Sequence, residues 1–276
     1  ENYSKEGWNS MERLCREIGM PETVTERLLA IHADAGFAPD VEKLMHEETW
    51  SDGLSALNKE LGADPDGMKM LCCMLRCALS AWTRYQELKI PRKIYINTMA
   101  CFSRFVREHL ESFGSYGFDR GFWTVRQVSC KLFRIGELEY ELAVRENAPQ
   151  IRVHIPSDAQ LVRALLCASV AQAKALIARC FPAYENAPMC CCSWLLSPTL
   201  KALLPAQSRI LEFQKSFRIT PLGSGDSYRQ WVYRDPNLPI TDFPENTALQ
   251  RNLKAYLLNG GVFTEAEGIL LQNPFQ

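Results

Sequence analysis

Two neighbouring segments carry side chains that can exchange a proton with a substrate. Carboxylates alternate with apolar residues over 137–144, and a guanidinium and an imidazole alternate with apolar residues over 150–156. A period of two is typical of half-buried strands, so each segment presents its charged residues on one face. A turn near Glu146 makes the strands antiparallel and places Glu139 opposite His154 and Glu141 opposite Arg152, since a slip of one residue would put charges opposite apolar residues.

A carboxylate beside an imidazole can act as a general base that deprotonates an amine. His154 and Glu139 are therefore the candidate catalytic residues. The alternative interpretation is a solvated sheet face that carries cross-strand ion pairs and no catalytic role.

Cysteines form a second group with chemical potential. Three of the eleven, Cys190, Cys191 and Cys192, are consecutive in an apolar run, which invites an acyl-cysteine mechanism. The sequence shows no base to activate them, and the cysteines lack the two-residue spacing of a zinc site. We expect buried, reduced thiols, with neither a disulfide nor a metal site.

The remaining chemistry-bearing side chains have structural explanations. Tyr228, Trp231 and Tyr233 could line a pocket or donate a proton to a leaving thiolate, but we assign them to the packing of a hairpin of 217–222 against 228–233. Asp158 is expected to be the N-cap of a helix over 159–180. Ser193 is expected to cap the end of a strand.

The elements that position these residues fall into two regions. Apolar residues recur at helical spacing from Trp8 to about Phe113, which predicts a helical domain over 1–117. The Gly114-Ser-Tyr-Gly117 break is followed by three predicted strands (127–135, 137–144 and 150–156), a helix, a strand over 189–196 and further helices. The fold class is α+β, with an N-terminal helical bundle (1–117) and a mixed sheet with flanking helices (118–276).

Composition excludes several classes of protein. The 276 residues include 31 Lys and Arg against 32 Asp and Glu, so we expect no nucleic-acid partner. No apolar run approaches the roughly 18 residues of a membrane span, so we expect no membrane partner and a cytoplasmic location. The start at Glu1 rather than Met is consistent with removal of an N-terminal segment.

Several segments together resemble a known family. Residues 118–127, 132–141, 153–156, 193–198 and 210–214 resemble those of bacterial acyltransferases with a helical N-acyltransferase N-terminal domain and a GNAT-like C-terminal domain. The resemblance implies an acyl-CoA co-substrate, acetyl-CoA or another, in a cleft where the strand 150–156 splays from the strand 189–195. It also implies cofactor contacts from Ile155, Pro156, Ser157 and Ser193, with pyrophosphate at the start of the following helix.

The chain departs from the family pattern at the phosphate loop. Residues 157–162 contain no glycine, and none occurs between Gly136 and Gly223. Without glycine the backbone approaches a pyrophosphate less closely, so we expect weaker CoA binding than in glycine-loop relatives. The leading hypothesis is an acyl-CoA-dependent N-acyltransferase with a small-molecule amine acceptor. The alternatives are a non-enzymatic small-molecule binding protein on the same fold, and an assembly role for the helical domain.

Overall fold

A computed structural model describes residues 10–34, 36–37, 39–235, 237–272 and 274–275. The chain divides into two compact units, Glu1–Arg134 and Ile135–Gln276. The division falls after Arg134, whereas the sequence predicted it after Gly117. The difference arises because helix α7 (Gly121–Val128) packs on α4 (Met68–Glu87) within the first unit.

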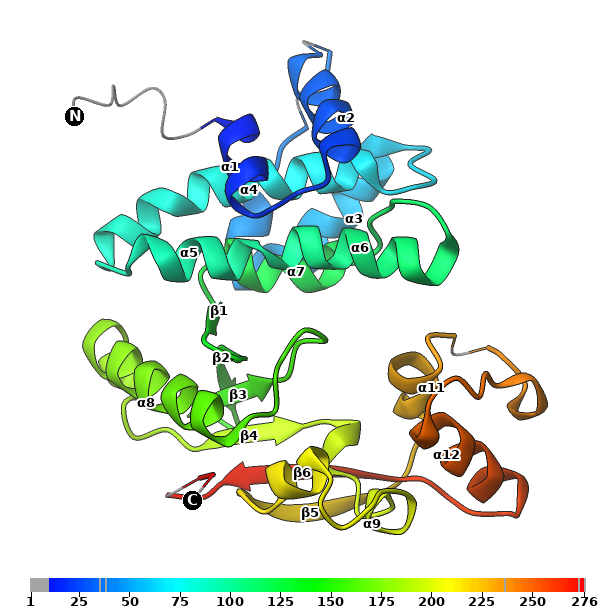
Figure 1. The fold of residues 1–276 in the computed structure, drawn as a ribbon. Helices are drawn as coiled ribbons and strands as arrows, with labels where there is room; N and C mark the ends of the chain where they lie inside the picture. The colour runs from blue at the N-terminus through cyan, green and yellow to red at the C-terminus, as the bar shows by residue number, and fades with distance from the viewer. Residues whose placement is uncertain (1–9, 35, 38, 236, 273, 276) are drawn as a thin grey trace. The chain divides into compact units, whose positions relative to one another are not determined.

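The first unit is helical in its described residues, as predicted, apart from the start of strand β1 (Leu132–Ile135) at its C-terminal end (Figure 1). Besides α4 and α7 it contains α1 (Met11–Glu17), α2 (Glu22–Ala33), α3 (Trp50–Leu61), α5 (Arg92–Met99), α6 (Cys101–Phe113) and the short 3-10 helices η2 (Glu42–Met45) and η3 (Glu47–Thr49). Helix α4 forms the centre and is buried along most of its length. The predicted helix over 93–112 is interrupted at Ala100 and forms α5 and α6.

The start of α4 shows how local sequence specifies a helix terminus. The carboxylate of Asp64 accepts hydrogen bonds from the backbone N–H groups of Lys69 (3.0 Å) and Met70 (2.9 Å), which have no partner inside the helix. Gly67 occupies the N-cap position with φ of +70°, and a Cβ there would lie 1.8 Å from the carbonyl oxygen of Phe118. Asp64 therefore caps the helix from outside the N-cap position.

The second unit contains a mixed sheet with flanking helices, so the predicted fold class is confirmed (Figure 1). The strand order is β1-β2-β3-β4-β6-β5, in which β3 and β4 are parallel and the pairs β2/β3, β4/β6 and β5/β6 are antiparallel. The strands are β1 (Leu132–Ile135), β2 (Leu138–Arg145), β3 (Ala148–His154), β4 (Met189–Cys192), β5 (Phe217–Ser224) and β6 (Thr264–Leu270). The helices are α8 (Arg163–Cys180), α9 (Leu200–Leu203), α10 (Arg209–Gln214), α11 (Ser227–Val232), α12 (Ala248–Leu258) and the 3-10 helices η4 (Pro182–Tyr184), η5 (Trp194–Leu196) and η6 (Ile240–Asp242).

The predicted pairing of β2 with β3 is confirmed residue by residue. Glu139 lies opposite His154 and Glu141 opposite Arg152. The connecting turn places Glu146 and Asn147 at positive φ (52° and 63°), the geometry of a tight hairpin whose twist matches that of the strands. The turn therefore fixes the register that the alternation of polar and apolar residues suggested.

Three predicted strands are wrong in part. One was expected over 189–196, but β4 ends at Cys192 and Trp194–Leu196 form η5. Another was expected to begin at Gln127, but Gln127 is buried in α7 and the strand begins at Leu132. The segment 228–233 was expected to pair with 217–222, but most of it forms α11, and β5 pairs instead with β6. Tyr228 and Tyr233, at the two ends of α11, pack into one aromatic cluster. In a strand these two side chains would point to opposite faces.

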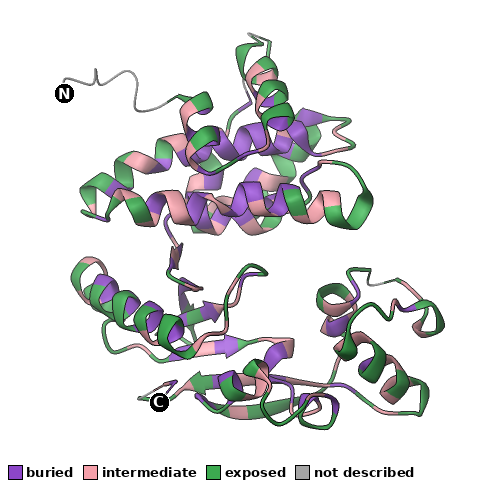
Figure 2. Cartoon of the chain, in the orientation of Figure 1, coloured by how far each residue is buried: buried purple, intermediate pink, exposed green. Residues whose placement is uncertain are grey.

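One face of β2 is apolar and packs against α8. The Tyr140 hydroxyl and Ser169 Oγ lie 2.9 Å apart across this contact, and Leu138 N donates to the same Ser169 oxygen at 3.3 Å. Figure 2 shows buried residues along β2 and on one side of α8, whereas β5 is mostly exposed. In the described part of the chain no helix is both long enough and apolar enough to span a bilayer.

Candidate functional site

The opposite face of β2 and β3 carries the charged residues. His154 Nε2 lies 2.8 Å from Glu141 Oε2, and Arg152 Nη1 lies 3.9 Å from the other oxygen of the same carboxylate. The Glu141 side chain is only 7 % exposed, and that of His154 is 24 % exposed. The interpretation of this face as solvated is therefore wrong at the carboxylates, since Glu139 and Glu141 are both buried.

The carboxylate bonded to the imidazole is Glu141. Glu139 is directly opposite His154 in the backbone register, as predicted, but the imidazole extends diagonally to Glu141, two residues further along β2. Diagonal neighbours across an antiparallel pair lie within reach of long side chains. Strand alternation identifies both carboxylates as candidates, and only side-chain geometry assigns the hydrogen bond.

Strands β3 and β4 part at their C-terminal ends, as the resemblance implied. Their pairing covers Ile151 with Met189 and Arg152 with Cys190, whereas β3 continues to His154 and β4 to Cys192. Over Cys190–Cys192 the other edge of β4 pairs with β6. The His154–Glu141 pair thus lies at the end of β3 where its pairing with β4 has ceased.

The segment between β3 and α8 contains three of the predicted cofactor-binding residues. Ile155 and Pro156 follow the strand, and Ser157 lies in a turn closed by the hydrogen bond from Ala159 N to Pro156 O (2.9 Å). The helix begins at Arg163 and not at 159, so the expected N-cap role of Asp158 is wrong. A hydrogen bond from Gln160 N to Glu137 Oε2 (2.6 Å) holds the segment outside the helix.

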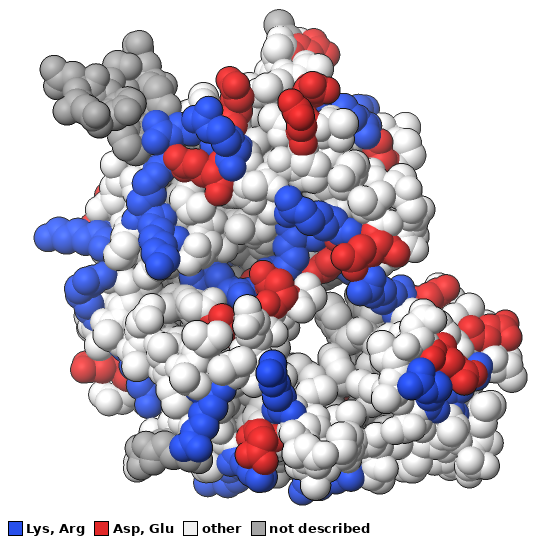
Figure 3. Space-filling view, in the orientation of Figure 1, with Lys and Arg blue, Asp and Glu red and all other residues white. Residues whose placement is uncertain are grey.

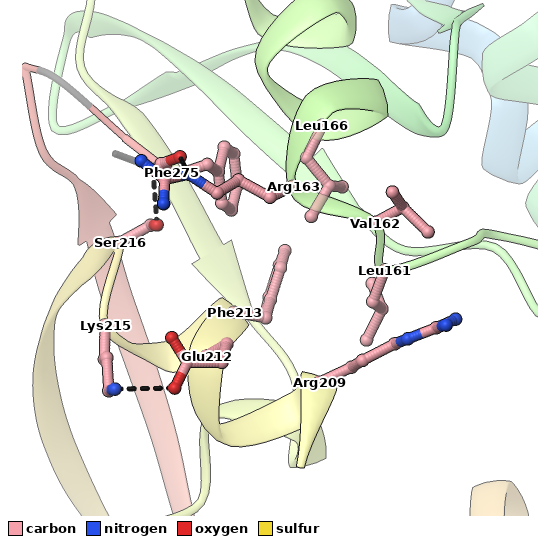
Figure 4. A pocket seen from close by; sticks show the side chains of 10 residues that line it. All are labelled: Leu161, Val162, Arg163, Leu166, Arg209, Glu212, Phe213, Lys215, Ser216 and Phe275. Atoms are coloured by element: carbon pink, nitrogen blue, oxygen red, sulfur yellow. Dashed lines mark hydrogen bonds and ion pairs between the residues drawn. The ribbon is translucent and has the colours of Figure 1, made fainter. Parts of the chain in front are cut away.

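A cavity of about 300 Å³ opens where α8 begins. Its lining includes three basic side chains, Arg163 from α8, Arg209 from α10 and Lys215 after α10. Figure 4 shows Arg163 turned toward Phe275, Lys215 toward Glu212, and Arg209 extending from α10 past Leu161. The helix start at Val162 has no side-chain cap, so its first N–H groups add positive potential to the basic cavity.

No pattern in the sequence indicates this cavity. Arg163 and Arg209 are far apart in the chain, and each occurs in a segment that resembles an ordinary solvated helix face. On the face of the molecule in Figure 3, Lys and Arg are interspersed with Asp and Glu, so charge density alone does not mark a site. The cavity forms because α10 packs beside the start of α8 with Phe213 and Phe275 between them.

Ser193, the fourth predicted cofactor-binding residue, follows β4. Its hydroxyl accepts a hydrogen bond from Leu195 N (3.2 Å) and caps η5, in agreement with the expected capping role. Ser193 follows the last residue of β4. It therefore lies at the C-terminal end of β4, where this strand no longer pairs with β3.

The cysteines of β4 are poor nucleophiles at neutral pH. Cys191 is buried, Cys190 is half-buried and Cys192 is exposed. Burial raises the pKa of each thiol, and the nearby Glu267 raises the pKa of Cys190 and Cys192 further. A thiol with a raised pKa is mostly protonated at pH 7, which disfavours an acyl-cysteine intermediate.

The tyrosines near α11 belong to a separate core. Tyr233 stacks on Phe243 with ring centroids 3.8 Å apart, and its hydroxyl donates to Gln250 O at 2.8 Å. Burial raises the pKa of Tyr233 to about 12. Tyr228 packs in the same cluster, while Trp231 is exposed. These contacts support the packing role expected for the two tyrosines.

The chain matches two known protein domains. Residues 132–270 match the GNAT-like C-terminal domain, and residues 9–130 match the N-acyltransferase N-terminal domain. No curated protein sequence matches. An acyltransferase solved with decanoyl-CoA and teicoplanin is 21% identical with a TM-score of 0.75, covering 95% of this chain and 88% of its own.

Two further solved structures share the fold. An acyltransferase mutant in complex with octanoyl-CoA is 20% identical with a TM-score of 0.76 and covers 98% of this chain and 88% of its own. An acyltransferase in complex with CoA and 10C-teicoplanin is 19% identical with a TM-score of 0.68 and covers 95% of this chain and 99% of its own. Through both of its matched regions, the chain belongs to the family that joins an N-acyltransferase N-terminal domain to a GNAT-like C-terminal domain.

Proposed function

We propose that the protein is an acyl-CoA-dependent N-acyltransferase that transfers an acyl group to a small-molecule amine. The observation that carries this proposal is the parting of β3 and β4 after Arg152 and Cys190, with the bonded pair His154 and Glu141 at the same end of β3. An opened edge of β3 can hydrogen-bond the amides of pantetheine and bring a thioester to the imidazole. The complexes of structural neighbours with decanoyl-CoA and octanoyl-CoA support this donor.

The donor would run from the opening to the start of α8. The thioester would lie by the backbone of Ile155, and pantetheine would pass Pro156 and Ser157 on one side and Ser193 on the other. The nucleotide phosphates would lie in the basic cavity by Arg163, Arg209 and Lys215. Side-chain cations thereby supply the attraction that a glycine loop supplies through backbone N–H groups.

The transfer would proceed by direct attack. The amine nitrogen attacks the thioester carbonyl carbon, His154 accepts the proton that the nitrogen loses, and the C–S bond breaks to release the CoA thiolate, which is then protonated. Glu141 would orient the imidazole and stabilise the imidazolium through the 2.8 Å hydrogen bond. Glu139, buried on the same face and opposite His154 in the register, is the second candidate carboxylate.

The alternative function, a binding protein without catalysis, has one observation in its favour. The phosphate loop lacks glycine, which would weaken CoA binding. The cavity offsets this weakness, because Arg163 and Arg209 line it together with Lys215, whose ammonium is paired with the Glu212 carboxylate at 2.6 Å. The comparisons favour a transferase, since the matched structures are acyltransferases.

The test is transfer itself. Purified protein is incubated with acetyl-, octanoyl- or decanoyl-CoA and a panel of primary amines, and N-acyl products are detected by mass spectrometry. We expect a product with at least one donor and a loss of product in His154→Ala. The proposal is overturned if no donor gives a product and saturating acyl-CoA leaves the melting temperature unchanged.

A further inference from the structure

Phe275 forms part of the wall of the basic cavity, although it follows β6 at the far end of the sequence. Its backbone N–H donates to Ser216 Oγ at 2.7 Å, and its ring stacks on Phe213 with centroids 5.6 Å apart. Only 6 % of Phe275 is exposed. The residue is therefore anchored at both its backbone and its ring (Figure 4).

The carbonyl group of Phe275 binds the cation at the start of α8. Arg163 Nε donates to this oxygen at 2.5 Å, and Cys167 Sγ, one turn further along α8, lies 3.5 Å from it. A carbonyl oxygen is a neutral acceptor, whereas a phosphate offers a charged, bidentate partner for a guanidinium. Arg163 thus lies in a cavity suited to an anion while its Nε–H is bound to a weaker acceptor.

The backbone of Phe275 is in a conformation that phenylalanine rarely adopts. Its φ is +62°, in the left-handed region, where a bulky side chain is disfavoured. Such a conformation persists only where surrounding contacts impose it. Ser216, Arg163 and Cys167 bind the backbone of Phe275, and Phe213 and Phe217 pack on its ring. Loss of the Arg163 contact would remove one of these.

We propose that Phe275 is a latch on the cavity, which a phosphate group of the CoA donor opens by displacing the Phe275 carbonyl from Arg163. This inference rests on the proposed function and adds regulation of the same site. With the latch closed, the Nε–H of Arg163 is bound to Phe275, and the apparent affinity for CoA falls in proportion to the fraction of molecules in the open state. Binding of CoA then releases Phe275, and departure of CoA allows it to close again.

The test measures the dissociation constant of free CoA by isothermal titration calorimetry. Phe275→Ala removes the ring that anchors the latch, and Ser216→Ala removes the hydrogen bond to its backbone. Each is expected to tighten CoA binding by about threefold to tenfold, because the closed state is less populated. Leu271→Ala, an exposed apolar residue in the same segment, is the matched control and is expected to leave binding unchanged.

A double-variant cycle distinguishes a latch from a fixed wall. In an Arg163→Ala background the Phe275 carbonyl has no guanidinium to bind, so Phe275→Ala should no longer tighten CoA binding. Weaker or unchanged CoA binding in both Phe275→Ala and Ser216→Ala overturns the latch, as does an equal gain with and without Arg163. If wild-type protein binds no CoA at all, it is the proposed function that fails.

Discussion

Replacement of Glu141 by Gln tests the assignment of the carboxylate that serves His154. Gln keeps the length and shape of the side chain and can still bond the imidazole, but it carries no charge. The residue is a positioning residue, because it would act on the substrate through His154. Glu267 offers a matched control on β6, since its carboxylate also binds a cation, Arg145 Nη1 at 3.2 Å, but it is partly exposed and bonded to a different residue.

The magnitude follows from the hydrogen bond. Bonds to charged groups contribute about 1.5 to 3 kcal/mol and neutral bonds about 0.5 to 1.5 kcal/mol, so the substitution weakens stabilisation of the imidazolium by about 1 to 1.5 kcal/mol. That difference corresponds to a fall in kcat of about tenfold. Removal of the base itself in His154→Ala should lower kcat by about 100-fold to 10,000-fold.

The assay is steady-state transfer to an amine across a range of pH, with product measured by mass spectrometry. We expect Glu141→Gln to lower kcat and to alter its pH profile while the KM for acyl-CoA stays the same, and we expect Glu267→Gln to change kcat less than twofold. Equal effects of the two substitutions would refute the assignment of Glu141. Full activity in His154→Ala would refute the role of the base.

Three further outcomes follow from the structure. Cys190→Ala and Cys192→Ala should retain activity, because burial raises the pKa of both thiols and transfer is direct; loss of turnover in either, with the fold intact by circular dichroism, would indicate an acyl-cysteine. Gly136→Ala should lower the free energy of unfolding, measured by urea titration, by about 2 to 4 kcal/mol, because φ is +62° and the added Cβ would lie 2.9 Å from a side-chain carbon of α8. Gly260→Ala, at positive φ in open space, should lower it by about 1 kcal/mol in the same titration. Partial burial raises the pKa of Glu17, but two arginines outweigh it and leave the pKa below 4.5. Glu17 therefore contributes about 0.5 to 1 kcal/mol, after solvent screening, to the free energy of unfolding above pH 4.5, and this contribution is lost as the pH falls through the folded-state pKa. Glu17→Gln should flatten the acid limb of stability against pH, and an unchanged limb would contradict this.

Local patterns in the sequence determine much of the fold. Alternation over 137–144 and 150–156 predicts β2 and β3, and the requirement to keep charges off the apolar face selects the register of Glu139 with His154. Thr247 and the glycines after Leu258 delimit α12, where the capping box forms. These features depend on neighbouring residues, whose spacing is fixed by the covalent chain.

Tertiary structure decides the features that depend on distant partners. The pairing of β5 with β6 joins strands about forty residues apart. No residue pattern in either strand specifies its partner, so the sequence is equally consistent with a local pairing of β5 with 228–233. The segment after Tyr228 is helical because this places Tyr228 and Tyr233 in one cluster with Phe243 and Phe263. Non-local burial thus overrides the local alternation.

The candidate site divides in the same way. The sequence alone determined that Glu139, Glu141, Arg152 and His154 share one strand face, because side chains alternate along any strand. It could not determine which carboxylate binds His154, since a rotamer chooses between opposite and diagonal neighbours only within the packed sheet. Nor could it reveal the basic cavity or the contact of Phe275 with Arg163, 112 positions apart, because these exist only once α8, α10 and the segment after β6 pack together.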